Sequence, residues 1–353
     1  MIEANAGTKP VAEQHAFDIA ALERYLLARL DGFGGPLTVE QFKGGQSNPT
    51  YKLITPNRSY VMRSKPGPAA KLLPSAHAIE REYRVMRALA GTGVPVPRVH
   101  LLCEDTSVVG TPFYLMDFVE GRVFWDASLP GLEPRERAAL YDELNRVIAA
   151  LHQVDVAAVG LSDFGRPGRY LERQIERWTR QYRASETERI DAMERLIEWL
   201  PAHVPAADET SLVHGDYRID NVIFHPTEPR ILGVLDWELS TLGHPLADFA
   251  YHCMSWRVTP DEFRGIKGHD LDALGIPQEA PYVEAYRRRT GRESLPDWDY
   301  YLAFNMFRMS AILQGILARA LQGNATSAQA EATGRLARPM AEAGWRQITA
   351  LTG

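Results

Sequence analysis

Two short segments in the second half of the chain most constrain what it can be. Residues 214–221 have the sequence His-Gly-Asp-Tyr-Arg-Ile-Asp-Asn, and residues 235–238 have the sequence Leu-Asp-Trp-Glu. They supply a carboxylate base in Asp216, an amide oxygen in Asn221 and a second carboxylate in Asp236. This set suits magnesium-dependent phosphoryl transfer, in which a carboxylate accepts the proton of an attacking hydroxyl and oxygen ligands hold the metal.

The residues between the two segments predict how the metal ligands come together. Residues 222–224 and 231–235 predict two short buried strands, joined by the turn-rich segment 225–229. We therefore expect a hairpin that returns Asp236 to the side of Asn221. Either motif alone is more typical of an ordinary turn or strand end, but their order and spacing favour an active site.

The combined pattern resembles the aminoglycoside phosphotransferase family of small-molecule kinases, which is related to the protein kinases. The Tyr-Arg pair after His-Gly-Asp, together with Asp-Trp-Glu, resembles most closely the phosphotransferase domains associated with acyl-CoA dehydrogenases. The resemblance implies an α+β, bilobal, protein-kinase-like fold. An N-terminal nucleotide-binding lobe with an antiparallel sheet plus a helix would comprise residues 1–116, a hinge residues 117–121, and a larger, mainly helical catalytic and substrate-binding lobe residues 122–353.

The N-terminal region has the pattern of strands around a glycine loop. Residues 37–43, 51–55 and 60–63 predict strands, and helices are predicted over residues 17–30, capped by Asp18, and 78–89. Glycines let backbone amides approach an anion, so we expect the loop to close over nucleotide phosphates. An ordinary hairpin turn is the alternative for this loop. Its residues are Gly44, Gly45, Gln46, Ser47 and Asn48.

Protein kinases hold the nucleotide phosphates with a lysine that pairs with a helix glutamate. The resemblance places Arg63 at the lysine position, with Lys65 as a second candidate, and favours Glu82 over Glu80 as the partner. A guanidinium can bridge a phosphate and a carboxylate, so the departure from lysine is compatible with the role.

The apolar strand predicted over residues 113–119 leads into the expected hinge. By position, Asp117 and Val119 are candidates for backbone contacts with an adenine ring. The alternative is a plain strand end without a ligand.

The resemblance also implies roles around the catalytic segment. Arg218 is expected to stabilise the transferred phosphoryl group, with a simple salt bridge as the alternative. His214 is expected to orient the loop, and Asp248 to support it from behind. Glu238 could orient a metal-bound water or cap the next segment.

Composition excludes several classes of protein. The 353 residues are enough for a substantial core, and the formal net charge of −6 argues against a nucleic-acid partner. The two cysteines have no disulfide or metal spacing, and the chain start has no leader pattern, so we expect a cytoplasmic protein. The apolar segment 303–321 contains arginines and amides, which favours a core helix over a membrane span.

The acceptor is the least constrained part of the prediction. The resemblance implies a kinase that uses ATP and Mg²⁺ to phosphorylate a small-molecule hydroxyl, such as that of a hydroxyacyl-CoA. An aminoglycoside or other small alcohol, or a regulatory pseudokinase, are the alternatives. Four arginines at helical spacing could bind coenzyme A phosphates, or could form an ion-paired surface with Glu172 and Glu176. They are Arg169, Arg173, Arg177 and Arg180.

Overall fold

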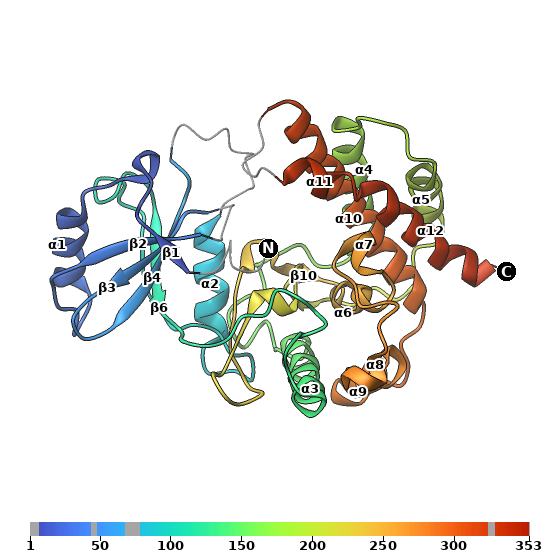
Figure 1. Ribbon diagram of the computed structural model, residues 1–353, viewed down its shortest axis with the longest axis horizontal. Coiled ribbons are helices and arrows are strands. Elements are labelled where there is room, and N and C mark those ends of the chain that lie inside the picture. The colour runs from blue at the N-terminus through green and yellow to red at the C-terminus, as the bar shows by residue number, and fades with distance from the viewer. Residues whose placement is uncertain (1–6, 44–47, 68–77, 324–328, 353) are drawn as a thin grey trace. The chain divides into compact units, whose positions relative to one another are not determined.

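The chain forms two compact units in the computed structural model, which describes residues 7–43, 48–67, 78–323 and 329–352 (Figure 1). The first, here called the sheet unit, comprises Met1–Val123 and Val222–Leu239. The second, the helical unit, comprises Phe124–Asn221 and Ser240–Gly353. The sequence-based division placed residues 222–239 in the C-terminal lobe, whereas here they group with the sheet unit. The hinge at residues 117–121 stays a prediction.

The sheet unit is built on a six-stranded antiparallel sheet with the strand order β1-β2-β3-β4-β6-β5. Successive side chains point to opposite faces, as in β3, where Tyr51 and Leu53 are buried and their neighbours are half-buried. The strands are β1 (Thr8–Lys9), β2 (Thr38–Phe42), β3 (Thr50–Ile54), β4 (Ser59–Ser64), β5 (Val99–Cys103) and β6 (Phe113–Asp117).

Two helices cover opposite faces of this sheet (Figure 1). The helix α1 (Ile19–Arg29) begins after Asp18, whose carboxylate accepts a hydrogen bond from the backbone three residues on, over 3.0 Å. Leu22 and Leu26 of α1 pack into the core on one face. A short 3₁₀ turn, η1 (Glu13–His15), precedes α1, and α2 (Ile79–Leu89) covers the other face.

The spacing of residues along β4 and α2 directs Arg63 of β4 and Glu82 of α2 into the space between the sheet and the helix. Met62 of β4 packs in the core with α1, so its neighbour Arg63 points to the opposite face, where α2 lies. On α2, Glu82 is followed at helical spacing by the buried residues Met86 and Leu89. Glu82 therefore lies on the buried face of α2, with 1% of its surface exposed.

A hairpin of β8 (Val222–Phe224) and β9 (Ile231–Val234) confirms the two strands expected after the catalytic segment. The backbones of Arg122 and Phe224 exchange two hydrogen bonds of 2.8 Å, and β9 donates to the carbonyl of Pro95 over 2.9 Å. These bonds explain why the hairpin groups with the sheet unit. The turn η3 (Trp237–Leu239) follows β9 and packs on α2.

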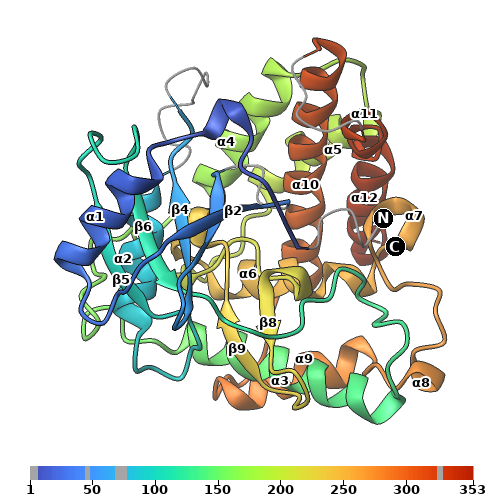
Figure 2. The same cartoon turned by 60° about the vertical axis from the view of Figure 1, so that its left-hand side comes forward.

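The helical unit is organised around α10, whose residues are buried on nearly every side. Helices α4, α5, α6, α11 and α12 pack against it (Figure 2). The helices are α3 (Pro134–His152), α4 (Tyr170–Ala184), α5 (Asp191–Ala202), α6 (Pro245–Cys253), α7 (Pro260–Phe263), α8 (Leu271–Leu274), α9 (Glu279–Arg289), α10 (Trp298–Leu321), α11 (Ala330–Gly334) and α12 (Ala337–Thr352), with the turns η2 (Ile219–Asn221) and η4 (Met254–Trp256).

A two-stranded antiparallel ladder positions the catalytic segment within the helical unit. Strand β7 (Ser211–Val213) leads into residues 214–221, and its partner β10 (Thr241–Gly243) leads into α6. Because the two strands pair, the start of the catalytic segment and the start of α6 lie side by side. The sequence pattern did not predict this ladder.

The predicted α+β class, with an antiparallel sheet and many helices, is confirmed. The apolar segment near residue 303 lies within α10, as expected for a core helix. Across the described residues, every helix is too short or too polar to cross a membrane.

Candidate active site

Arg63 is the centre of a buried charge cluster in the sheet unit. Its Nε lies 3.0 Å from Oε2 of Glu82, and its Nη2 lies 2.8 Å from Oδ1 of Asp236 and 3.7 Å from Oε2 of Glu238. Burial alone would lower the pKa of Arg63, but Glu82 and the other carboxylates raise it. The guanidinium is therefore permanently charged and shared by three acidic groups.

Glu82 is held by neutral donors as well as by Arg63. Asn48 donates its amide Nδ2 to Oε1 over 3.0 Å, and Tyr114 donates its hydroxyl to Oε2 over 3.1 Å. Burial raises the pKa of Glu82 to about 7, against the lowering effect of Arg63 and with further raising by Asp236 and Glu238. The single positive charge of Arg63 thus does not neutralise the three carboxylates. A further cation bound nearby would reduce the repulsion between them.

Asp236 follows β9 in a left-handed backbone conformation, with φ of 62°. Such a conformation costs energy for a residue other than glycine and is frequent at functional sites. The next residue, Trp237, is buried and donates its indole N–H to the carbonyl of Val234 over 2.9 Å. This anchor holds the turn, and Asp236 keeps about a third of its side chain exposed.

The structure describes only some of the other residues that the sequence predicts to contact the nucleotide. Gly44, Gly45, Gln46 and Ser47 lie outside the described residues. Asn48 donates to Glu82. Lys65 forms an ion pair with Glu80, so Arg63 and Lys65, the two basic residues predicted to contact phosphate, each pair with a different glutamate. Which of them contacts phosphate stays a prediction.

Asp117 and Val119 are the residues of the predicted hinge that could contact an adenine ring. The backbone N–H of Asp117 donates to the carbonyl of Arg98 over 2.9 Å, and the Asp117 side chain bonds to His100 over 2.7 Å and to Arg58. Val119 is half-buried. Adenine recognition at these two positions remains a prediction.

The catalytic segment of the helical unit is fixed from behind by Asp248 of α6. Its Oδ2 accepts from the backbone N–H of His214 and its Oδ1 from that of Gly215, each over 2.8 Å. Burial would raise the pKa of Asp248, but hydrogen bonds from His152 and His214 lower it below its ordinary value. Arg308 of α10 donates to the carbonyl of Gly215 over 2.6 Å. Asp248 therefore stays ionised as an acceptor for the loop.

Three side chains hold the carboxylate of Asp216. Oδ1 accepts from the hydroxyl of Tyr251 over 2.5 Å and lies 3.1 Å from Nε of Arg218, and Oδ2 accepts from Nδ2 of Asn221 over 2.9 Å. Burial, followed by the charge of Asp216, raises the pKa of Tyr251, so the phenol keeps its proton and donates. His214 is fully buried, and its Nδ1 accepts from the backbone N–H of Asp216 over 3.2 Å.

Asn221 and Asp236 each offer an oxygen suited to a hard cation. The amide nitrogen of Asn221 donates to both the backbone carbonyl and the carboxylate of Asp216, each over 2.9 Å, which fixes the amide and leaves Oδ1 as its acceptor atom. Asp236 uses Oδ1 for Arg63 and retains Oδ2. Within the described residues, no three His, Cys, Asp or Glu side chains form a ready metal cage. Mg²⁺ commonly binds one or two protein oxygens, the substrate phosphates and water, so each of these oxygens by itself is a suitable ligand type.

The arginine series on α4 divides into paired and unpaired members. Arg169 lies 3.4 Å from Glu172 and Arg180 3.7 Å from Glu176, while Arg173 donates to backbone carbonyls. Among the residues that the structure describes, Arg177 forms no ion pair with a carboxylate, and its guanidinium lies over the ring of Trp178. Burial and then the nearby charge of Arg308 lower the pKa of Arg177.

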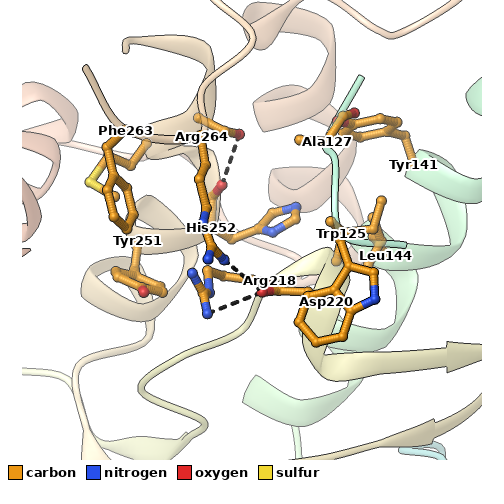
Figure 3. A pocket seen from close by; sticks show the side chains of 13 residues that line it. Trp125, Ala127, Tyr141, Leu144, Arg218, Asp220, Tyr251, His252, Phe263 and Arg264 are labelled. Carbon is orange, nitrogen blue, oxygen red and sulfur yellow. Dashed lines mark hydrogen bonds and ion pairs between the residues drawn. The ribbon is translucent and has the colours of Figure 1, made fainter. Parts of the chain in front are cut away.

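Sequence reasoning missed Tyr251 as a partner of the expected base. The residue follows Asp248 by three positions on α6, so both side chains reach the catalytic segment from the same helix face. Helical spacing from Asp248 was the available signal. It also missed that Arg264 joins Arg218 at the carboxylate of Asp220 (Figure 3).

The fold and these two charge clusters define the chain as a phosphotransferase-type protein. The sequence profile of the phosphotransferase enzyme family matches residues 38–303, and the chain belongs to that family. A Ralstonia eutropha JMP134 protein of known crystal structure, provisionally assigned as an aminoglycoside phosphotransferase, is 61% identical in sequence to this chain. It covers 95% of this chain and 99% of its own, with a TM-score of 0.87.

More distant structures share the fold. The aminoglycoside phosphotransferase APH(4)-Ia, crystallised with ADP and hygromycin B, has a TM-score of 0.60 at 17% identity, over 93% of this chain and 98% of its own. The predicted kinase-like fold and phosphotransferase family are thereby confirmed.

Curated relatives are longer proteins. Acyl-CoA dehydrogenase family member 10 of Mus musculus is 50% identical over 342 residues, which are 96% of this chain and 32% of that protein. Acyl-CoA dehydrogenase family member 11 of Homo sapiens is 42% identical over 342 residues, 95% of this chain and 43% of that protein. The chain spans less than half the length of these relatives.

Proposed function

We propose that the protein is a small-molecule kinase that transfers the γ-phosphoryl group of ATP to a hydroxyl. The observation that carries the proposal is the arrangement around Asp216. Among the described residues, Oδ1 accepts a hydrogen bond from Tyr251 and lies 3.1 Å from the guanidinium of Arg218, whereas Oδ2 accepts one hydrogen bond, from Asn221. A carboxylate oxygen accepts about two hydrogen bonds, so Oδ2 retains room for the proton of an acceptor hydroxyl. A base in a fixed orientation is what in-line transfer requires.

The mechanism assigns one role to each group. Asp216 orients the acceptor hydroxyl and takes its proton as the hydroxyl oxygen bonds to the γ-phosphorus, while the bond from the γ-phosphorus to the bridging oxygen of ADP breaks. Arg218 offsets the charge of the transferred group. Arg63, held by Glu82, contacts the nucleotide phosphates.

Asn221 and Asp236 are proposed as the ligands of magnesium. When bound, the ion supplies charge neutralisation of the nucleotide phosphates. The excess of carboxylates around Arg63 supports a requirement for cations. The glycine loop, Asp117 and Val119 are proposed as further nucleotide contacts.

For the acceptor we propose a hydroxyacyl-CoA. The names of the curated relatives connect this type of domain with acyl-CoA chemistry. Arg177, a cation without a carboxylate partner in the described part of the chain, offers a contact for a coenzyme A phosphate. An aminoglycoside is disfavoured, because polycationic drugs need free carboxylates and Asp220 beside the loop is already paired with two arginines.

An acceptor panel tests this function. ATP consumption is measured with hydroxyacyl-CoAs, free hydroxy acids, aminoglycosides and choline, using Asp216→Asn as the control. We expect Mg²⁺-dependent turnover with hydroxyacyl-CoAs and little with the polycationic drugs. Absence of turnover with every acceptor, although wild type and variant bind nucleotide equally, would instead favour a regulatory pseudokinase.

A further inference from the structure

A small cavity lies beside the catalytic segment within the helical unit (Figure 3). Its volume is about 60 Å³. Its apolar walls come from separate elements: Trp125 from the segment before α3, Tyr141 and Leu144 from α3, and Phe263 from α7. Tyr141 is fixed by a hydrogen bond from its hydroxyl to the carbonyl of Ala127, over 2.6 Å.

Two side chains that line the cavity also contact the proposed base. Tyr251 bonds to Oδ1 of Asp216 over 2.5 Å, and Nε of Arg218 lies 3.1 Å from the same oxygen. The cavity is therefore separated from the reacting carboxylate by single side chains. A group bound there lies one side chain away from Asp216.

The charged side chains of the cavity wall form ion pairs. Among the described residues that line it, Asp220 supplies the only carboxylate, 3.3 Å from Nη2 of Arg218 and 3.1 Å from Nη1 of Arg264. Burial lowers the pKa of His252 to about 4, so its ring is neutral at neutral pH. The described lining residues therefore offer no unpaired carboxylate to an ammonium ligand, and the apolar walls favour an uncharged, apolar one.

We propose that this cavity receives the aliphatic arm of the acceptor, the part of the carbon chain that continues beyond the hydroxyl-bearing carbon. The proposal rests on the kinase function above and specifies its substrate class. A water-sized group needs at least about 15 Å³ of such volume, so about four chain carbons are the upper limit for the cavity. Acceptors with arms up to that length fit, and the coenzyme A end of the molecule lies outside the cavity.

The first experiment varies the arm length. With hydroxyacyl-CoAs that differ only beyond the hydroxyl carbon, kcat/KM should rise about fourfold for each added carbon until the cavity is full, and then stop rising. Ala127→Leu adds side-chain volume to the lining and should move the limit to shorter arms. Phe263→Ala should move it to longer arms, a gain that misfolding cannot produce. Ala192→Leu, on α5 away from the cavity, is the matched control.

The second experiment is independent of turnover. The protein is labelled with 5-fluorotryptophan, and the Trp125 resonance, assigned with Trp125→Phe, is followed by fluorine NMR during titration with 1-butanol. We expect a saturable shift in wild type and in Ala192→Leu, and at least a tenfold loss of affinity in Ala127→Leu.

The outcomes separate the two proposals. A Trp125 resonance that does not respond to 1-butanol, or turnover that is independent of arm length and of both cavity variants, overturns the cavity assignment and leaves the kinase function intact. Saturable binding without phosphorylation of any acceptor overturns the kinase function, and with it the acceptor role of the cavity. Arm-length limits that shift in opposite directions in Ala127→Leu and Phe263→Ala support both.

Discussion

The hydroxyl of Tyr251 lies 2.5 Å from Oδ1 of Asp216 and donates its proton to that oxygen. The ring is buried on α6, and the guanidinium of Arg308 lies over it, 5.2 Å from the ring centre. Asp216 thus holds the hydroxyl of Tyr251, and Arg308 packs on its ring. We infer that Tyr251 is a positioning residue for the proposed base, which has no other phenol donor among the described residues.

Tyr251→Phe removes this donor without changing the shape of the core. We expect kcat to fall about tenfold, because the carboxylate gains rotational freedom, while KM for the acceptor changes less than about twofold. Steady-state kinetics measures both values. Tyr300→Phe, which removes a buried phenol bond to the carbonyl of Leu200 over 3.0 Å, controls for a loss of stability alone. Equal kinetic effects of the two variants would contradict the positioning role.

Asp248→Ala removes the acceptor of two buried backbone N–H groups. His214 and Gly215 would then lack their 2.8 Å partner, and we expect the free energy of unfolding to fall by about 3 kcal/mol. Urea unfolding measures this change. Asp191→Ala, where the carboxylate is 76% exposed, should change stability by less than about 0.5 kcal/mol. A small effect at Asp248 would mean that the catalytic segment does not depend on it.

Glu82 should make stability depend on pH in the absence of nucleotide. Its ordinary pKa is 4.5, and in the folded protein it is raised to about 7, chiefly by burial. The folded state therefore holds a proton that the unfolded state releases between these values. The stabilising contribution is complete below about pH 4.5 and is lost as pH rises through about 7.

Comparison with Glu82→Gln isolates this contribution, because glutamine keeps the size of the side chain but does not titrate. From about pH 4.5 to pH 7 the unfolding free energy of wild type, relative to the variant, should fall by up to about 3 kcal/mol. Urea unfolding at several pH values measures it. A relative gain of wild-type stability over the same range would show instead that the ion pair with Arg63 outweighs burial.

Arg177 on α4 and Arg169, the residue that precedes this helix, provide a matched pair for the coenzyme A contact. Arg169 is 79% exposed and paired with Glu172, whereas Arg177 has no carboxylate partner in the described part of the chain. We expect Arg177→Gln to raise KM for acyl-CoA acceptors about tenfold without changing kcat, and Arg169→Gln to change it less than about twofold. Similar effects of both substitutions would point to general surface charge.

Local patterns in the sequence were sufficient for most of the sheet unit. The strands around residues 38–64, the cap at Asp18 and the hairpin before Asp236 all follow from alternation, turn residues and capping chemistry within a few positions. The pairing of Arg63 with Glu82 rather than Glu80 was predicted from the family resemblance, and alternation on β4 with helical spacing on α2 explains the contact in the structure.

Long-range relationships were not accessible in this way. Strands β7 and β10 have three residues each, too few for a periodic signal, yet their pairing places α6 behind the catalytic segment. The bond from Tyr251 to Asp216 joins residues 35 apart in the chain, and only the packing of α6 brings them together. The apolar cavity beside Asp220 likewise depends on α3 and α7, which no local motif connects.

The most direct test of the central claim is the rate at which wild type and Asp216→Asn transfer the γ-phosphoryl group of ATP to a hydroxyacyl-CoA, followed by mass spectrometry of the acceptor. We predict a phosphorylated acceptor with wild type and Mg²⁺, and a rate lower by about a thousandfold in the variant, which keeps nucleotide binding. Equal rates for the two proteins would contradict the assignment of Asp216 as the base.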